Sequence, residues 1–312
     1  MSDWKRIVAG VDFTDHALNA LREAARWTRR DKAELHVVHV VESLVITELQ
    51  ETLKTPIEDM EAQVREDTIS RLNSMIEEAS LEGYRLVDET PMTQGKQDGM
   101  TAEVRLGNPT EELIATLNDH QADLLVMARN STSSPERGAG TYAVRCVRKG
   151  PADVLLVRNE HTGRFKQIAV GVDFSEQSER AVRAGAELAK RDNAELTLVH
   201  VFYPPWEVVH FSSLPVDTSP AFQNEYRQLL TDRLKNLAAP HVEGRPHVKY
   251  DVYPAATHGS GMVDYLTEIK ADLAIVASHG KSNIKRFLLG STAERVIRDS
   301  PCSTLVLKDQ PS

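Results

Sequence analysis

The residues of this sequence best suited to chemistry lie in one loop close to its C-terminus, at positions 278–292. Gly280 and Gly290 would let the backbone approach a bound group closely, because glycine has no Cβ atom. Ser291 and Thr292 supply hydroxyl groups where a helix is expected to begin, and the N-terminus of a helix attracts anions. Positive counter-charges are available in the same loop: Lys281, Lys285 and Arg286. The combination predicts a loop that binds phosphate groups.

A second candidate is Asp173, which ends an apolar run at 168–173. Its carboxylate could accept hydrogen bonds from the edge of a base or a sugar, and it could also cap the turn or helix that follows. In open parallel sheets, ligands bind beyond the C-terminal ends of strands, where the strand order reverses. Asp173 and the loop each follow an expected strand, so both are candidates for such a site.

An internal repeat defines the elements that must position these residues. The segment 7–14, Ile-Val-Ala-Gly-Val-Asp-Phe-Thr, returns as Ile-Ala-Val-Gly-Val-Asp-Phe-Ser at 168–175, an offset of 161. The Ala-Asp-Leu triplet at 122–124 returns only 149 residues later, so the first copy carries an insertion of 12 residues, best placed around 90–100. The chain therefore holds two copies of one domain, joined by a polar linker at 159–166.

Within each copy, apolar runs of strand length alternate with amphipathic helical segments. The runs are nearly continuous, which is typical of strands in a sheet covered by helices on both faces. This alternation predicts an α/β fold with a doubly wound parallel sheet in each copy. In the second copy we expect strands at 168–173, 195–202, 247–253, 272–278 and 303–307, and helices at 178–191, 221–239, 261–269 and 290–299.

Length and composition fit two ordinary globular domains. The chain has 312 residues, of which 41% are hydrophobic, and about 150 residues per copy suffice for a buried core. The net charge of −9 argues against a general nucleic-acid binder. Residues 1–160 hold 19 basic and 28 acidic side chains, whereas residues 161–312 hold 18 of each. Anions are therefore expected to prefer the second copy.

The sequence also predicts a cytoplasmic location. No segment has the roughly 18 apolar residues of a membrane span, and the first residues form no apolar signal region. Cys146 and Cys302 are the only cysteines, which excludes a disulfide framework and a four-cysteine zinc site. We therefore expect contact with neither membranes nor nucleic acid.

The loop and the aspartate resemble the nucleotide site of the universal stress protein family, and the likeness covers nearly all of both copies. Members carry a Gly-x2-Gly-x9-Gly-Ser/Thr loop after the fourth strand and an aspartate that ends the first. This sequence reads Ala277-x2-Gly280-x9-Gly290-Ser291, so the spacing is intact and alanine replaces the first glycine. The chain is thus similar to the tandem, two-domain type of this family.

The resemblance implies a fold and a ligand. The fold is a pair of five-stranded, doubly wound parallel sheets of the adenine-nucleotide alpha-hydrolase type, with strand order 3-2-1-4-5 and domains at 1–158 and 164–309. The ligand is ATP or a related adenine nucleotide, with Mg²⁺ as a companion that no nameable side chain binds. The residues implied in nucleotide binding are Val172, Asp173, Val201, Ala277, His279, Gly280, Gly290, Ser291 and Thr292.

The resemblance also implies contacts between domains. Family members associate through their last strands, here 153–157 and 303–307, so the two domains are expected to form an intramolecular pseudo-dimer. A further homodimer and unnamed regulatory protein partners are compatible with this arrangement.

The first copy departs further from the family pattern. Its loop starts at Ala128 and reads Ala-x2-Ser-x8-Gly-Thr, so a serine replaces the second glycine and the spacing is one residue short. Pro135 and Glu136 stiffen the loop and add negative charge. Asp12 survives, but without a phosphate-binding loop it does not make a nucleotide site. We therefore expect a degenerate first copy.

The eleven histidines predict no metal site. His39 and His200 lie in expected strands and are interpreted as core residues with satisfied hydrogen bonds. His36 lies three residues before His39, so the two side chains would point to opposite faces of the sheet. His279 lies in the loop, where contact with a phosphate and simple solvation both fit.

Three functions remain open. The first is a regulatory protein of the stress response that binds ATP mainly in its second domain. The second is a nucleotide-free interaction or scaffold protein, which Ala277 and the altered first loop favour. The third is a slow ATP hydrolase or self-phosphorylating protein with Ser291 or Thr292 as acceptor, although the sequence shows no general base and no Walker A motif.

Overall fold

The chain divides into two compact units, Met1–Gly163 and Arg164–Ser312, in the computed structural model. The structure describes residues 4–43, 47–48, 52, 57–79, 85–86, 100–130, 140–208, 219–244, 247–280 and 289–308. Within these ranges, no helix is both long and apolar enough to cross a membrane.

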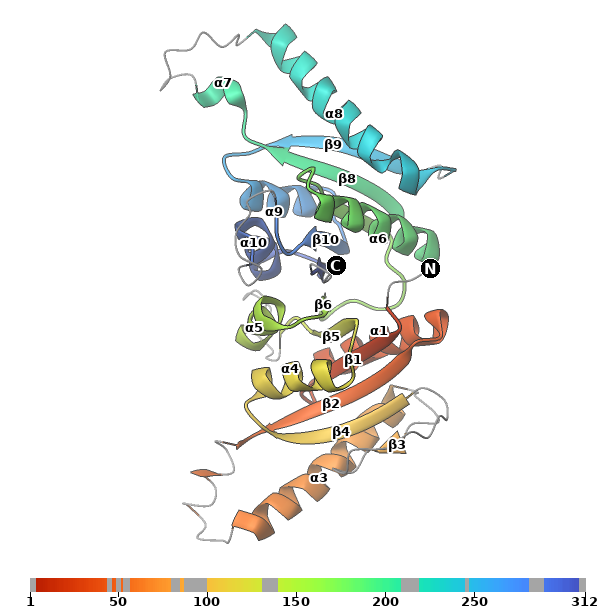
Figure 1. Ribbon diagram of the computed structural model, residues 1–312, viewed down its shortest axis with the longest axis vertical. Helices are drawn as coiled ribbons and strands as arrows, with labels where there is room; N and C mark the ends of the chain where they lie inside the picture. The colour runs from red at the N-terminus through yellow and green to blue at the C-terminus, as the bar shows by residue number, and fades with distance from the viewer. Residues whose placement is uncertain are drawn as a thin grey trace. The chain divides into compact units, whose positions relative to one another are not determined.

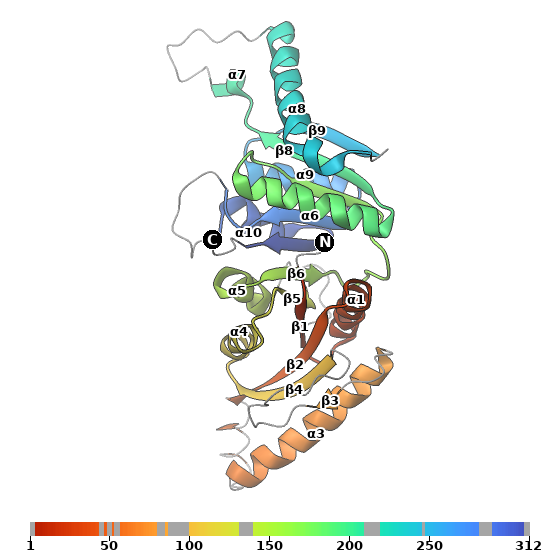
Figure 2. The same cartoon turned by 45° about the vertical axis from the view of Figure 1, so that its right-hand side comes forward.

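The second unit is a parallel sheet with helices on both faces. The strand order is β9-β8-β7-β10-β11, which is the predicted order 3-2-1-4-5. Helices α6 and α8 cover one face, and α9 and α10 cover the other (Figures 1 and 2). The strands are β7 (Gln167–Gly171), β8 (Glu195–Phe202), β9 (Val248–Pro254), β10 (Leu273–Ala277) and β11 (Ser303–Leu307). The helices are α6 (Glu176–Asp192), α7 (Pro205–Val208), α8 (Pro220–Val242), α9 (His258–Glu268) and α10 (Ser291–Asp299).

The first unit repeats this plan with one addition. Its order is β3-β4-β2-β1-β5-β6, so the short strand β3 is added outside β4 at the edge. This strand belongs to the longer connection of the first copy, where no strand was predicted. The strands are β1 (Arg6–Val11), β2 (Glu34–Glu42), β3 (Arg85–Leu86), β4 (Met100–Gly107), β5 (Leu124–Ala128) and β6 (Asp153–Val157). The helices are α1 (Asp15–Asp31), α3 (Ile57–Glu78), α4 (Pro109–Asp119) and α5 (Thr141–Lys149).

The first helix of each unit begins and ends in the same way. Thr14 caps α1 and Ser175 caps α6, each through a hydrogen bond from the backbone N–H three residues later to its hydroxyl oxygen. Both helices end at a residue in the left-handed region, Lys32 (φ 51°) and Asn193 (φ 56°). Since both pairs are 161 residues apart, the repeat of the sequence is also a repeat of the backbone.

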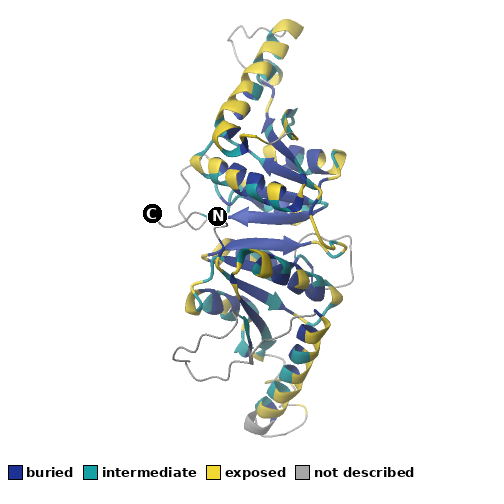
Figure 3. Ribbon diagram, turned by 90° about the vertical axis from the view of Figure 1, so that its right-hand side faces the viewer, coloured by how far each residue is buried: buried dark blue, intermediate teal, exposed yellow. Residues whose placement is uncertain are grey.

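The cores lie between the sheets and the inner faces of their helices (Figure 3). Val170, Leu198 and Ile275 on three adjacent strands are all 0% exposed. Burying each such side chain contributes about 1.5–3 kcal/mol, which explains why the apolar runs have no polar alternation. Helix α6 lies close to this layer, because a Cβ atom built on Gly185 would collide with Cγ2 of Val170.

A buried carboxylate is bonded within α1. Glu23 accepts hydrogen bonds from Trp27 Nε1 at 2.6 Å and from two nitrogens of Arg26 at 2.6 and 2.8 Å. His161 Nε2 lies 3.5 Å from the same carboxylate. Burial alone would raise the pKa of Glu23, but the hydrogen bonds and charges of Arg26 and His161 lower that pKa below its usual value. Glu23 is therefore ionised in the folded protein at neutral pH.

Two predicted boundaries need correction. The linker at 159–166 is not wholly polar surface, because Phe165 is 0% exposed and its N–H donates to Asp192 Oδ2 at 2.9 Å. The end of the linker thus belongs to the core of the second unit. The strand predicted at 168–173 ends at Gly171, which places Asp173 in the turn that follows.

Candidate functional site

The turn after β7 fixes the carboxylate of Asp173. Its Oδ1 accepts hydrogen bonds from the N–H of Ser175 at 3.0 Å and from the hydroxyl groups of Ser175 and Ser178. The N–H of Asp173 donates to Oγ of Ser178 at 2.9 Å. Asp173 therefore caps the turn, which is one of the roles that the sequence allowed, and Oδ1 takes part in fixing its orientation.

The next residue holds the turn in place. Phe174 adopts a left-handed conformation (φ 61°), which costs about 1–2 kcal/mol in a residue with a side chain. Its ring packs between His200, 4.4 Å away between ring centroids, and the guanidinium group of Arg233, 4.1 Å from the centroid. His200 Nδ1 also lies 2.7 Å from the carbonyl oxygen of Val172. The prediction that His200 has a satisfied hydrogen bond is confirmed.

Gly280 lies directly against Asp173. A Cβ atom built on Gly280 would collide with Oδ2 of Asp173. The turn that follows the first strand and the start of the loop are therefore in direct contact. This is the arrangement that the position of both motifs beside a strand-order reversal predicted.

The two ends of the loop also meet. The N–H of Gly290 donates to the carbonyl oxygen of Ser278 at 2.8 Å, and a Cβ atom on Gly290 would lie only 3.3 Å from that oxygen. The N–H of Ser278 donates to Leu307 at 2.8 Å, which ties this point to β11. Both glycines of the motif thus occupy crowded positions. The proposed counter-charges Lys281, Lys285 and Arg286 lie outside the described residues.

Helix α10 begins at this crowded point without a side-chain cap. Gly290 is the N-cap residue (φ −64°, ψ 144°) and supplies no capping group. Ser291 is exposed and Thr292 half-buried at the first two helical positions. Uncapped N–H groups and the positive end of the helix dipole together favour an anion here.

The remaining predicted residues lie at the same edge but differ in access. Ala277 ends β10 and is half-buried, and His279 Nδ1 lies 2.9 Å from Oγ of Ser278. Val172 is 4% exposed and Val201 6% exposed. A Cβ atom on Gly261 of α9 would lie 2.7 Å from Val201, so this valine side chain packs mainly on α9 rather than lining an open crevice.

The first unit has equivalent backbone and side-chain contacts at the matching end of its sheet. Asp12 Oδ1 accepts from the N–H and hydroxyl of Thr14 at 3.2 and 2.6 Å, and Gly140 N–H donates to the carbonyl of Arg129 at 2.9 Å. The position of Ser178 is taken by Ala17, so Asp12 lacks both of the hydrogen bonds that the Ser178 hydroxyl makes with Asp173. The altered loop residues Ser131, Pro135 and Glu136 lie outside the described residues.

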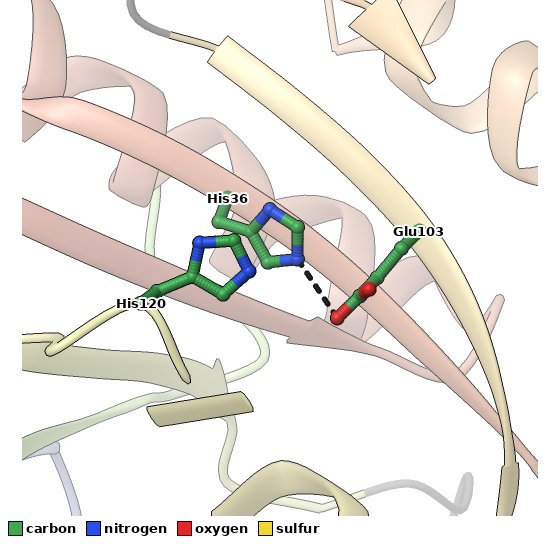
Figure 4. Close-up of side chains that lie close together, drawn as sticks. All are labelled: His36, Glu103 and His120. Carbon is green, nitrogen blue, oxygen red and sulfur yellow. Dashed lines mark ion pairs between the residues drawn. The ribbon is translucent and has the colours of Figure 1, made fainter. Parts of the chain in front are cut away.

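Sequence reasoning missed Ser178 as a group that fixes Asp173. The alignment of the two copies held the signal, because the hydroxyl is present only in the copy whose loop keeps its spacing. Sequence reasoning also missed three side chains of the first unit that the fold brings together, His36, Glu103 and His120 (Figure 4).

Comparisons with known proteins agree with the repeat. The model of the universal stress protein family matches residues 3–158 and again residues 164–308. A protein of Staphylococcus saprophyticus named for this family is 28% identical over 153 residues, which are 47% of this chain and 85% of that protein.

Solved structures show the same fold over the whole chain. The crystal structure of a universal stress protein from Archaeoglobus fulgidus covers 99% of this chain and 100% of its own, at 17% identity and a TM-score of 0.62. A structure from Pseudomonas aeruginosa UCBPP-PA14 named for the same family covers 99% and 94%, at 13% identity and a TM-score of 0.64.

Proposed function

The chain belongs to the universal stress protein family, and on that basis we propose that it is a regulatory stress-response protein whose second unit binds an adenine nucleotide, ATP in the first instance. The observation that carries the proposal is the approach of Gly280 to Oδ2 of Asp173, because it brings the two predicted motifs into contact.

The phosphates would lie at the N-terminus of α10. Gly280 and Gly290 would let the backbone come close to the phosphates, and the N–H groups and hydroxyls of Ser291 and Thr292 would donate hydrogen bonds to them. This placement is supported by the uncapped start of α10 and by the intact spacing of the loop. The neutral balance of residues 161–312, compared with the acidic first half, favours the second unit for an anion.

The adenosine would lie toward β7 and β8. The carboxylate of Asp173, which the turn orients, would accept hydrogen bonds from its polar edge. Val172 and Val201 would contribute backbone and a small apolar surface, since both side chains are largely buried. Mg²⁺ would accompany the phosphates without a protein ligand that can be named.

A nucleotide-free interaction protein is the second candidate, and Ala277 favours it. This half-buried residue stands at the end of β10 where the family pattern has glycine, so its Cβ atom would lie beside the ligand. The pseudo-dimer through 153–157 and 303–307, a homodimer and the cytoplasmic location belong to both candidates and stay predictions.

The test combines extraction and titration on the full chain. Acid extraction of the purified protein identifies any bound nucleotide, and calorimetry then measures ATP binding to the emptied protein. We expect one ATP per chain, a large loss of affinity in Asp173→Asn and Gly290→Val, and no loss in Asp12→Asn, the matched change in the first unit. Release of phosphate during the titration would identify the hydrolase alternative.

Two results would reject the proposal. No bound nucleotide together with no heat at millimolar ATP would leave the interaction protein as the better reading. Equal losses in Asp173→Asn and Asp12→Asn would show that binding is not confined to the second unit.

A further inference from the structure

The three side chains His36, Glu103 and His120 lie at the end of the first unit's sheet that is opposite to Asp12. His36 is the third residue of β2 and Glu103 the fourth of β4, and these strands run parallel with His36 beside Thr101. His120 is the C-cap residue of α4, which packs on the same strands. The cluster is therefore separate from the C-terminal ends of the strands, where Asp12 lies.

Their ligand atoms are close enough to share one ion. One nitrogen of each histidine and one oxygen of Glu103 all lie within 4.8 Å of one another, and His36 Nε2 is 3.0 Å from Glu103 Oε1 (Figure 4). In a tetrahedral zinc site with bonds of about 2.0–2.1 Å, ligand atoms are separated by about 3.3 Å. The distance that zinc requires between ligand atoms thus lies within the observed range, from 3.0 Å for His36 and Glu103 up to the limit of 4.8 Å.

Neighbouring groups already orient two of the three ligands. His36 Nδ1 lies 2.6 Å from the hydroxyl of Thr101, which leaves Nε2 directed at Glu103. Metal-binding histidines are commonly fixed in this way through their second nitrogen. The carboxylate of Glu103 is held by Nε of Arg105 at 2.6 Å, and Arg105 is held in turn by Asp119 at 2.8 Å.

The nitrogen of His36 that faces Glu103 is a second indication of a ligand. The side chain of His36 is only 5% exposed, and its Nε2 lies 3.0 Å from Oε1 of Glu103, the oxygen that also accepts from Nε of Arg105 at 2.6 Å. Among the described residues, Nε2 of His36 has this ion-pair contact but no well-aligned hydrogen bond, and a buried nitrogen in that position is costly. A cation bound to Nε2 would satisfy it.

From this geometry we infer that His36, Glu103 and His120 bind one divalent metal ion of the class that prefers imidazole, with Zn²⁺ as the expected ion and water in the fourth position. Two imidazoles and one carboxylate form a donor set that zinc accepts. The negative end of the α4 dipole at His120 also favours a cation.

Binding requires one local movement. The rings of His36 and His120 are stacked, 3.7 Å apart between centroids and inclined by 24°, so one ion cannot lie in the planes of both rings as they stand. The ring of His120 must turn out of this stack to face the ion. It is half-buried at the C-cap of α4.

The second unit shows that the fold does not require this cluster. The matching strand positions hold Thr197 and Asp251, and the C-cap of α9 is Ile269. Asp251 accepts a hydrogen bond from the hydroxyl of Tyr265 at 2.9 Å instead. A carboxylate at this point can therefore be satisfied without histidines, and the histidines of the first unit need another explanation.

The experiment uses the full chain, stripped with a chelator and desalted. Calorimetry with ZnCl₂ should show saturable one-to-one binding, and Co²⁺ should give the visible absorption of a tetrahedral site. His120→Ala and Glu103→Gln should each lower zinc affinity by at least about tenfold, and Thr101→Val by about 10- to 100-fold. His247→Ala, an exposed histidine of the second unit, is the matched control and should leave the affinity unchanged.

Circular dichroism of the metal-free variants checks that they fold. X-ray absorption at the zinc edge of the unchanged protein gives an answer that does not depend on any variant, with two imidazoles and oxygen ligands expected and no sulfur. Absence of zinc binding, unchanged affinity in both ligand variants, an equal loss in His247→Ala, or a zinc–sulfur distance from Cys146 or Cys302 would each overturn the assignment.

Discussion

Replacing Gly280 with alanine is the most informative single change to the proposed nucleotide site. No left-handed φ is required at Gly280, so alanine is acceptable to the backbone, and the added Cβ atom would collide only with the carboxylate of Asp173. That carboxylate cannot simply rotate away, because Oδ1 is bonded to Ser175 and to Ser178, which is 1% exposed. Either Asp173 gives up a hydrogen bond or the loop moves outward.

The expected size of the effect follows from these bonds. A hydrogen bond to a charged group contributes about 1.5–3 kcal/mol, and every 1.4 kcal/mol is about a factor of ten in affinity. Gly280→Ala should therefore weaken ATP binding by about tenfold to a hundredfold, as measured by calorimetry on the full chain. Thermal unfolding without nucleotide checks that the second unit stays folded.

The same substitution at two further glycines should lower ATP affinity by different amounts. A Cβ atom on Gly290 would lie 3.3 Å from the carbonyl of Ser278, which is tight, whereas one on Gly140 would lie 3.8 Å from the carbonyl of Arg129, an ordinary contact. The loss should be smaller for Gly290→Ala than for Gly280→Ala and absent for Gly140→Ala. If the unchanged protein binds ATP and Gly280→Ala binds it equally well, the crevice at Asp173 is not the binding site.

Three more changes test other contacts. Ser178→Ala removes the buried hydroxyl that fixes Asp173, so it should weaken ATP binding by several-fold in calorimetry and lower the melting temperature. Gly185→Ala should destabilise the protein by about 1–3 kcal/mol in urea unfolding, because overpacking outweighs the roughly 1 kcal/mol gain in helix propensity; an unchanged midpoint would contradict the close packing of α6. Glu23 has a lowered pKa in the folded state, so the stability it contributes is present above its unfolded pKa and is lost as pH falls through the folded one. Urea unfolding between pH 7 and pH 3 should thus show a smaller acid loss in Glu23→Gln, which is already less stable at pH 7, and equal slopes would refute the role of Arg26.

The sequence predicted the sheet of the second unit because its signals are local and repeated. Largely apolar runs such as 195–202 indicate strands in a sheet covered on both faces, and the repeat, at an offset of 161 for the first elements and 149 for the later ones, shows the same pattern a second time. The edge strand β3 could not be predicted, because two residues in an inserted connection carry no periodicity. Phe165 was read as linker because a single apolar residue among polar ones does not reveal that it is buried.

The two candidate sites differ in how much of each could be predicted from the sequence. Asp173 and Gly280 could be paired because a topological rule places both beside the same reversal of strand order. The cluster of His36, Glu103 and His120 could not be predicted in this way, because the alternation of side chains along a strand shows only which face of the sheet each side chain lies on. Glu103 and His120 are 67 and 84 residues away from His36 and come from a different strand and a helix end, so only the register of β2 with β4 and the packing of α4 bring them together.

The packing of Phe174 between His200 and Arg233 has a mechanical consequence. Arg233 is an exposed residue of α8, while Phe174 directly follows the aspartate of the proposed site. The turn cannot change its backbone conformation without moving the ring, and the ring cannot move without losing its contact with the outer helix. Phe174 thus couples the turn beside the proposed site mechanically to an exposed residue of the outer helix. The first unit has the same linkage, since Arg71 of α3 lies 4.4 Å from the ring of Phe13.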